Sequence, residues 1–171
     1  VTLSEIIQQV ISAIIWIYNN CKNYGGDKNK ITISGHSAGA HLCAMILENN
    51  WKKYNLPQDI IKGAALISGI FQPEIVLKLS VNKEIKLSKN EAIKNTPKSP
   101  KEKIPIILTC VGDQEPEGWI EQTKLYSKNA INMSSHLDFS ILNDENHFSM
   151  MISFSNSEHK FVKKLINMAK I

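Results

Sequence analysis

One pentapeptide constrains the fold of this chain more than any other feature. It reads Gly-His-Ser-Ala-Gly at residues 35–39, directly after the β-prone run 31–34 and at the start of the helix-compatible run 38–47. A turn this tight between strand and helix strains the backbone of its serine, and a side chain at either glycine would meet the neighbouring strand and helix. The pattern therefore predicts that Ser37 holds its hydroxyl above the end of a sheet.

Short apolar runs alternate with helical patterns along the rest of the chain. Runs typical of β-strands lie at 31–34, 61–68, 104–111 and 137–142, and patterns typical of helices lie at 4–18, 37–50, 117–133 and 157–171. This alternation predicts βαβ units and therefore an α/β fold, with a mostly parallel sheet flanked by helices. Reactive side chains in such folds collect beyond the carboxyl ends of the strands, where Ser37 is expected.

Length and composition indicate one domain. The chain has 171 residues, of which 43% are hydrophobic and 21% are charged, and this suffices for a single core. We expect residues 1–171 to form one domain with a cap-like insertion around 72–103, a mixed segment whose second half is rich in lysine. The lysines are more typical of a solvated connector, although in a cap they could admit a carboxylate.

Charge and cysteine usage exclude several classes of protein. The net charge is +4, but no basic stripe is interleaved with aromatic residues, so we expect no nucleic-acid partner. No run of about 18 apolar residues occurs, so we expect no membrane association.

The scattered Cys21, Cys43 and Cys110 lack metal-site or redox-pair spacing, and we expect the last two to be buried thiols. These observations predict no cofactor and a reducing, cytoplasmic location. The chain could pair as a homodimer, although the sequence does not fix its assembly.

Two downstream residues are candidate partners of Ser37. A serine hydroxyl attacks only with help from a base, and the base needs an acid to orient it. Asp113 follows the run 104–111, and His147 follows the run 137–142. Because each residue lies beyond a different parallel strand, we predict that Ser37, His147 and Asp113 meet as nucleophile, base and orienting acid.

Other residues compete for these two roles. The rival acids are Asp144, Glu115 and Glu117. The remaining histidines, which we expect to pack or hydrogen-bond locally, are His36, His41, His136 and His159. Asp113 could also be an ordinary turn residue, and His147 an ordinary loop histidine.

Stabilisation of an oxyanion needs two donors, and the sequence offers one. The backbone N–H of Ala38, at the start of the helix after Ser37, is the first. The second usually comes from a His-Gly-Gly-type loop after an earlier strand, and Gly25-Gly26 does not lie in that position. We expect residues upstream of Val1 to supply this donor, or else the chain to be inert.

The segment around the pentapeptide resembles the nucleophile elbow of the kynurenine formamidases (arylformamidases), α/β-hydrolases similar to the hormone-sensitive-lipase group. The string Gly-His-Ser-Ala-Gly-Ala-His-Leu at residues 35–42 carries most of the likeness. Further matches are Gly-Asp at 26–27, Ser-Gly-Ile-Phe at 68–71, Val-Gly-Asp at 111–113 and His-Phe at 147–148. The likeness implies an N-terminally truncated copy, with a partial α/β-hydrolase fold that lacks the N-terminal strands.

The resemblance also implies an activity. Family members hydrolyse N-formyl-L-kynurenine to L-kynurenine and formate in tryptophan catabolism, without a metal. Ser37 would be the nucleophile, His147 the base and then the acid, and Asp113 its orienter, with a small aryl formamide or ester as substrate. The alternatives are a general carboxylesterase and a catalytically inactive hydrolase-like or binding protein, because the fold does not fix the reaction.

Overall fold

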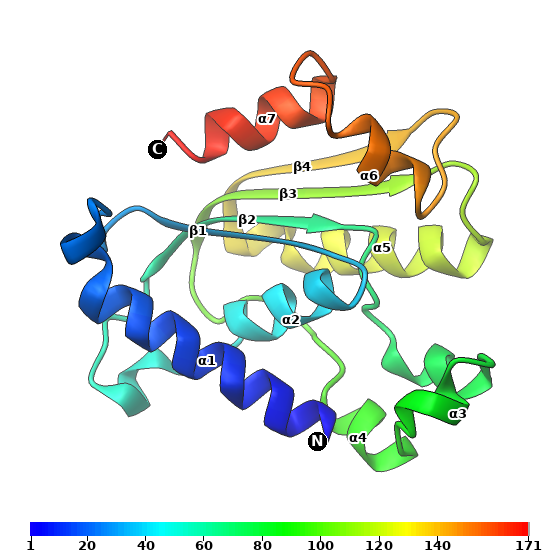
Figure 1. The fold of residues 1–171 in the computed structure, drawn as a ribbon, viewed down its shortest axis with the longest axis horizontal. Helices are drawn as coiled ribbons and strands as arrows, with labels where there is room; N and C mark the ends of the chain where they lie inside the picture. The colour runs from blue at the N-terminus through cyan, green and yellow to red at the C-terminus, as the bar shows by residue number, and fades with distance from the viewer. Residues whose placement is uncertain (171) are drawn as a thin grey trace.

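The computed structural model describes residues 1–170 and contains one parallel sheet between two layers of helices (Figure 1). Its strands are β1 (Ile31–His36), β2 (Ile61–Ile67), β3 (Ile104–Gly112) and β4 (Ser134–Leu142). They pair in the order β1-β2-β3-β4, and all three pairings are parallel. This arrangement confirms the predicted α/β class and the mostly parallel sheet.

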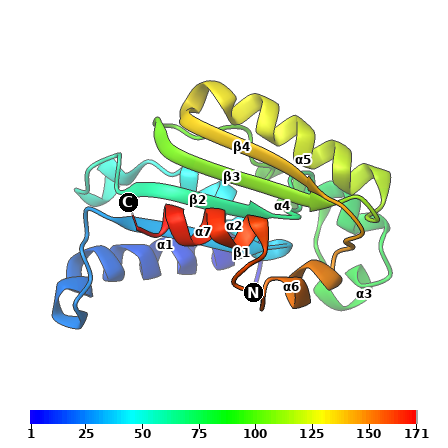
Figure 2. The same ribbon diagram turned by 90° about the horizontal axis from the view of Figure 1, so that it is seen from above.

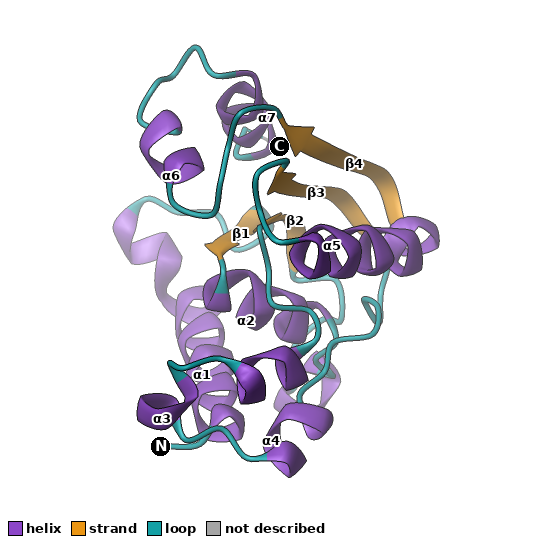
Figure 3. Ribbon diagram, turned by 90° about the vertical axis from the view of Figure 1, so that its right-hand side faces the viewer, coloured by secondary structure: helices purple, strands orange, loops and turns teal. Residues whose placement is uncertain are grey.

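Helices cover both faces of the sheet. The longer ones are α1 (Leu3–Asn20), α2 (Ala38–Leu47), α5 (Glu117–Ala130) and α7 (Lys160–Met168), and α6 (Ser149–Ser153) is a short one. Seen along the strands, α1, α2 and α5 lie on one side of the sheet and α6 and α7 on the other (Figure 3). Single 3-10 turns lie at η1 (Cys21–Tyr24), η2 (Trp51–Tyr54) and η4 (Ile131–Met133).

Alternation along the strands divides the core into two clusters. Ala64 and Leu66 of β2 pack on the side of α1, α2 and α5, together with Ile107 of β3. Ala65 and Ile67 face the opposite side, where the cluster includes residues of α6 and α7. Both faces of β2 and β3 are therefore largely buried, which explains why these strands are mostly apolar instead of alternating, with Lys62 and Thr109 as their polar residues.

The first helix shows how local sequence sets its boundary. The side chain of Thr2 accepts a hydrogen bond from the N–H of Glu5, and the carboxylate of Glu5 accepts one from the N–H of Thr2. This capping box satisfies donors that the helix cannot satisfy itself. Ile7, Ile11 and Ile14 follow at helical spacing and are buried against the sheet layer.

The segment 72–103 folds into three short helices beside the amino end of α1 (Figure 1). They are η3 (Pro73–Lys78), α3 (Asn82–Ile85) and α4 (Lys89–Lys94). Glu91 in α4 accepts a hydrogen bond of 2.8 Å from the N–H of Ser4, which ties the segment to α1. Its lysines from residue 83 to 98 are exposed, as expected for a solvated connector, and its role as a cap stays a prediction.

The carboxyl ends of the four strands gather at one edge of the sheet, at the right of Figure 1 and again in the view from above (Figure 2). The turn after β1, the turn after β3 and the loop after β4 all start from this edge. Among the described residues, no helix is long and apolar enough to cross a membrane.

Candidate active site

Ser37 occupies a strained turn between β1 and α2. Its φ is 57° and its ψ is −119°, a conformation that non-glycine residues rarely adopt. A Cβ on Gly35 would lie 2.3 Å from the backbone of Gly39, so only glycine fits at position 35. The same requirement was expected at Gly39 and is wrong there, because a Cβ on Gly39 would meet nothing within 4 Å.

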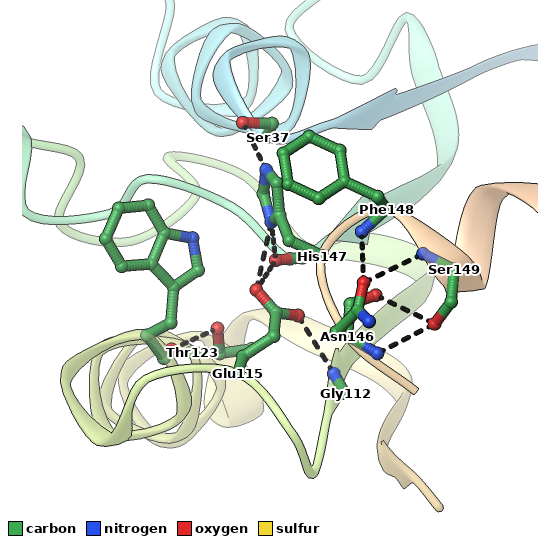
Figure 4. A network of polar contacts seen from close by, with 10 residues as sticks. Ser37, Gly112, Glu115, Thr123, Asn146, His147, Phe148 and Ser149 are labelled. Atoms are coloured by element: carbon green, nitrogen blue, oxygen red, sulfur yellow. Dashed lines mark hydrogen bonds and ion pairs between the residues drawn. The ribbon is translucent and has the colours of Figure 1, made fainter. Parts of the chain in front are cut away.

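His147 lies between Ser37 and a carboxylate (Figure 4). Its Nε2 is 2.9 Å from Oγ of Ser37, and its Nδ1 is 2.9 Å from Oε2 of Glu115. The fold thus joins two residues that are 110 positions apart in the chain. Hydroxyl, imidazole and carboxylate form one hydrogen-bonded line, the arrangement that activates a serine for nucleophilic attack.

The carboxylate against His147 belongs to Glu115 and not to Asp113, which corrects our prediction of the acid. Asp113 is exposed, and its N–H donates to the carbonyl of Leu142, so that its backbone still extends the pairing of β3 with β4. Glu115 was one of the three rival acids. The other two, Asp144 and Glu117, are exposed.

A tight turn after β3 brings Glu115 back over the strand end. The N–H of Glu115 approaches the carbonyl of Gly112 at 3.4 Å, and Oε1 of its carboxylate accepts a hydrogen bond of 3.0 Å from the N–H of Gly112. A Cβ on Gly112 would lie 2.1 Å from the carbonyl oxygen of Glu145, in the loop that carries His147. Glycine at position 112 therefore lets the acid loop and the histidine loop pack together.

Hydrogen bonds keep the buried carboxyl of Glu115 ionised. Its side chain is only 1% exposed, and burial alone would raise its pKa. The hydrogen bonds from His147, Ser68 and the N–H of Gly112 outweigh burial and hold the pKa below its usual value. A charged carboxylate on Nδ1 favours the tautomer of His147 whose Nε2 can accept the proton of Ser37.

Aromatic rings enclose His147 on several sides. Their centroids lie 4.5 Å from it for His36, 5.4 Å for Phe148 and 6.0 Å for Trp119. Burial, together with the nearby His147, lowers the pKa of His36 and keeps that ring neutral. Phe148 is 77% exposed, so one wall of the site faces solvent. The indole N–H of Trp119 is buried and has no hydrogen-bond partner among the described residues.

The loop that presents His147 is fixed by its neighbour. Oδ1 of Asn146 accepts hydrogen bonds from the N–H groups of Phe148 and Ser149, and the N–H of Asn146 donates to Oγ of Ser149 (Figure 4). These bonds form a side-chain turn that leads into α6. The backbone of His147 is thereby held on both sides, which limits how far its ring can move from Ser37.

The other histidines lie outside the line of contacts through His147. Nε2 of the buried His41 is 2.7 Å from the carbonyl of Asn95, and burial lowers the pKa of His41. Nδ1 of His159 accepts a hydrogen bond from the N–H of Phe161 at the start of α7. His136 lies within β4. Trp51 is only 1% exposed and belongs to the core.

Ser68 is the contact residue that the sequence did not point to. It lies directly after β2, is fully buried, and contacts both Glu115 and His147. In the sequence, Ser68 stands out only as the start of the string Ser-Gly-Ile-Phe at residues 68–71, which resembles the kynurenine formamidases but carries no predicted role. Among residues 1–170, no group of three or more His, Cys, Asp or Glu side chains is arranged to hold a metal ion.

Comparison with known proteins agrees with this geometry. Residues 2–105, more than half of the chain, match the BD-FAE family. The chain belongs to that family. It is also 25% identical to a kynurenine formamidase of Danio rerio over 95% of its own length, and 34% identical to a kynurenine formamidase of Salmo salar over 56%. It spans 56% and 31% of the lengths of these two relatives.

Solved structures share the fold at lower identity. The carboxylesterase EstE1, from a metagenomic library, superposes with a TM-score of 0.72 at 17% identity, covering 99% of this chain and 63% of EstE1. An esterase of the archaeon Pyrobaculum calidifontis superposes with a TM-score of 0.73 at 15% identity, covering 99% of this chain and 60% of the esterase. The predicted α/β-hydrolase architecture is therefore confirmed.

Proposed function

We propose that this protein is a serine hydrolase of amide or ester bonds, in which Ser37, His147 and Glu115 are nucleophile, base and orienting acid. The observation that carries the proposal is the distance of 2.9 Å between Oγ of Ser37 and Nε2 of His147. A hydroxyl at this distance from an imidazole can pass its proton as it attacks a carbonyl carbon. Glu115 on Nδ1 then stabilises the imidazolium that forms.

The reaction proceeds in two halves. The oxygen of Ser37 forms a bond to the acyl carbon while its proton moves to Nε2 of His147. The bond from the acyl carbon to the leaving group then breaks, and the leaving group takes that proton from Nε2. In the second half, water gives a proton to Nε2 of His147 while its oxygen forms a bond to the acyl carbon. The bond from that carbon to Oγ of Ser37 then breaks, Oγ takes the proton from Nε2, and the acid product leaves.

The backbone N–H of Ala38 is the proposed donor to the oxyanion. Ala38 is the first residue of α2, so its N–H has no acceptor within the helix and lies at the positive end of the helix dipole. It follows Ser37 directly, which places it next to the carbonyl under attack. A preorganised donor of this kind contributes about 10²–10³ in rate.

An aryl formamide is the substrate we infer, with N-formyl-L-kynurenine as the leading compound and formate as the acyl product. The likeness to two kynurenine formamidases supports this choice over a general ester. A small-ester carboxylesterase is the second candidate, favoured by the superposition on solved esterases. The same three residues would serve either reaction, because they act on the carbonyl carbon in both and fix neither the acyl group nor the leaving group.

One experiment ranks these functions. The protein in the longest form that its gene encodes and the Ser37→Ala variant of that form are each given N-formyl-L-kynurenine and p-nitrophenyl acetate, and the products are followed by absorbance. We expect turnover of the formamide to exceed turnover of the ester, and the variant to lose both. Preference for the ester would favour the carboxylesterase. Absence of turnover with both substrates in the unaltered chain would support an inactive, hydrolase-like protein and overturn the proposal.

A further inference from the structure

The backbone of Ser68 has a positive φ, which is uncommon for a residue other than glycine. It follows β2 directly, its φ is 45°, and its side chain and backbone are fully buried. Its N–H continues the sheet by donating to the carbonyl of Cys110 at 2.7 Å. Residues other than glycine adopt such a φ at a cost in free energy, and buried examples gather at functional sites.

The strained turn directs the hydroxyl of Ser68 at the other two members of the site. Its Oγ is 2.5 Å from Oε2 of Glu115 and 2.8 Å from Nδ1 of His147. The same carboxylate oxygen is 2.9 Å from Nδ1. The three atoms therefore form a closed triangle on the side of the imidazole opposite Ser37.

The direction of these hydrogen bonds follows from the chemistry of the groups. For Nε2 of His147 to accept the proton of Ser37, Nδ1 has to carry a hydrogen. The ionised carboxylate of Glu115 can only accept, so the hydroxyl of Ser68 cannot receive a hydrogen from it and has to donate. The hydroxyl hydrogen of Ser68 therefore points to Oε2 of Glu115, while the oxygen of Ser68 is a second acceptor for the Nδ1–H group of His147.

We propose that Ser68 is a positioning residue, whose hydroxyl holds the Glu115 carboxylate against Nδ1 of His147. The inference rests on the proposed function, because it concerns the same reaction. The N–H of Gly112 fixes Oε1 of the carboxylate, and Ser68 fixes Oε2. Without Ser68, His147 would be the only donor left to Oε2, so one of the two hydrogen bonds that set the position of this oxygen would be lost.

Loss of the Ser68 hydroxyl should change the ionisation of Glu115, an effect that a loss of packing alone would not produce. The carboxyl of Glu115 is buried, so each lost donor weakens its ionised form relative to the protonated form. Protonated Glu115 can no longer stabilise an imidazolium. The acidic limb of the pH profile therefore moves to higher pH when the hydroxyl is removed, in addition to a fall in rate at neutral pH.

The test compares Ser68→Gly with Ser68→Ala. Glycine accepts a positive φ without strain, so Ser68→Gly removes the hydroxyl and relaxes the backbone, whereas Ser68→Ala removes the hydroxyl only. If alanine at this position prevents folding, the glycine variant still tests the role of the hydroxyl. Ser127→Ala is the matched control, because its buried hydroxyl bonds Thr109 and the carbonyl of Thr123, outside the site.

Two readouts are measured for each protein from pH 4 to pH 9. The first is the rate at which a fluorophosphonate labels Ser37, located by peptide mass spectrometry. The second is the downfield proton resonance of Nδ1–H in His147. We expect both Ser68 variants to label about 10- to 100-fold more slowly, the range for a hydrogen bond to a charged group, with an acidic limb at higher pH. The Nδ1–H resonance should move upfield in both, and Ser127→Ala should match the unaltered protein.

Three outcomes separate the two proposals. If the unaltered protein labels at Ser37 and folded Ser68→Gly labels at the same rate with the same acidic limb and proton resonance, the role of Ser68 is overturned and the proposed function stands. If the unaltered protein does not label at Ser37, the proposed function fails and the positioning role fails with it. Slow labelling with a shifted acidic limb supports both.

Discussion

Oε2 of Glu115 lies 2.9 Å from Nδ1 of His147, whereas Asp113, on the same loop, is exposed. The loop between β3 and α5 thus contains two acidic side chains, and the turn places only the second, Glu115, against His147. If Glu115 orients His147, the reaction depends on the charge of Glu115 and much less on the charge of Asp113, although the two carboxylates are only two residues apart.

Glu115→Gln should therefore lower kcat/KM with either candidate substrate at least about 10²-fold, because a neutral amide can no longer stabilise the imidazolium of His147. Asp113→Asn removes the same charge from the same loop and should stay within about twofold of the unaltered protein. Both variants are compared with p-nitrophenyl acetate at neutral pH. The reverse order of effects would return the role to Asp113.

The choice between Asp113 and Glu115 could not be predicted from the sequence. Both residues follow β3, so the chain order of serine, acid and histidine admits either one. The deciding feature is the turn in which Gly112 bonds Glu115 twice, through its carbonyl and through its N–H. This turn depends on the packing of Gly112 against Glu145, a contact between residues distant in sequence.

The sheet and the place of Ser37 were predictable because local signals agree. The strands 61–67 and 104–112 are apolar on both faces, which is typical of buried parallel strands, and the glycine at position 35 is required by the turn it predicts. The helices in 72–103 were not predictable in this way. They are short, and no periodic apolar pattern in the sequence marks them. They are stabilised by contacts with residues distant in sequence, such as the hydrogen bonds between Ser4 and Glu91 and between His41 and Asn95.

Gly112→Ala tests whether the acid loop and the histidine loop must approach this closely. The added Cβ would meet the backbone of Glu145 at 2.1 Å, so one loop has to move. We expect the free energy of unfolding to fall by about 1–3 kcal/mol. The rate of Ser37 labelling should fall by a larger fraction than the free energy of unfolding does. Denaturant unfolding and fluorophosphonate labelling provide the two measurements.

Gly118→Ala is the control for this variant, since Gly118 lies six residues further along the chain, in the first turn of α5, and a Cβ there meets only the side chain of Ile75 at 3.6 Å. It should fold and label as the unaltered protein does. A Gly112→Ala protein of unchanged stability would mean that the two loops are not packed as described.

His147→Ala should be nearly as damaging as Ser37→Ala, because the members of such a site act as a unit. We expect labelling of Ser37 to slow by about 10³-fold or more at neutral pH, because the imidazole that lies 2.9 Å from Oγ of Ser37 is removed. His159→Ala, in which the lost ring caps α7 outside the site, is the matched variant. Rapid labelling of His147→Ala would place the base elsewhere.

The thiols provide a test of the fold that does not depend on activity. Burial raises the pKa of Cys43 to about 12 and also raises the pKa of Cys110, so neither forms a thiolate near neutral pH, while Cys21 is partly exposed. At pH 7.5 a maleimide should modify one thiol per folded chain, at Cys21, and all three after denaturation. Rapid modification of Cys110 in the folded protein would show that β3 is not at the centre of the sheet.

The lowered pKa of Glu115 makes one contribution to stability depend on pH, with a definite sign. A carboxyl whose pKa is lower in the folded than in the unfolded protein stabilises the fold above its ordinary value of 4.5, and this contribution is lost as the pH falls through the lower folded value. We therefore expect the difference in free energy of unfolding between the unaltered protein and Glu115→Gln to be constant from pH 6 to pH 5. Below about pH 4.5 it should shrink, because the carboxyl of Glu115 is then protonated in the unfolded chain while it stays charged in the folded protein. Denaturant melts at half-unit steps of pH measure this difference, and a gap that widens on acidification would mean that the carboxyl of Glu115 is protonated in the folded protein, so that it could not serve as the charged partner of His147.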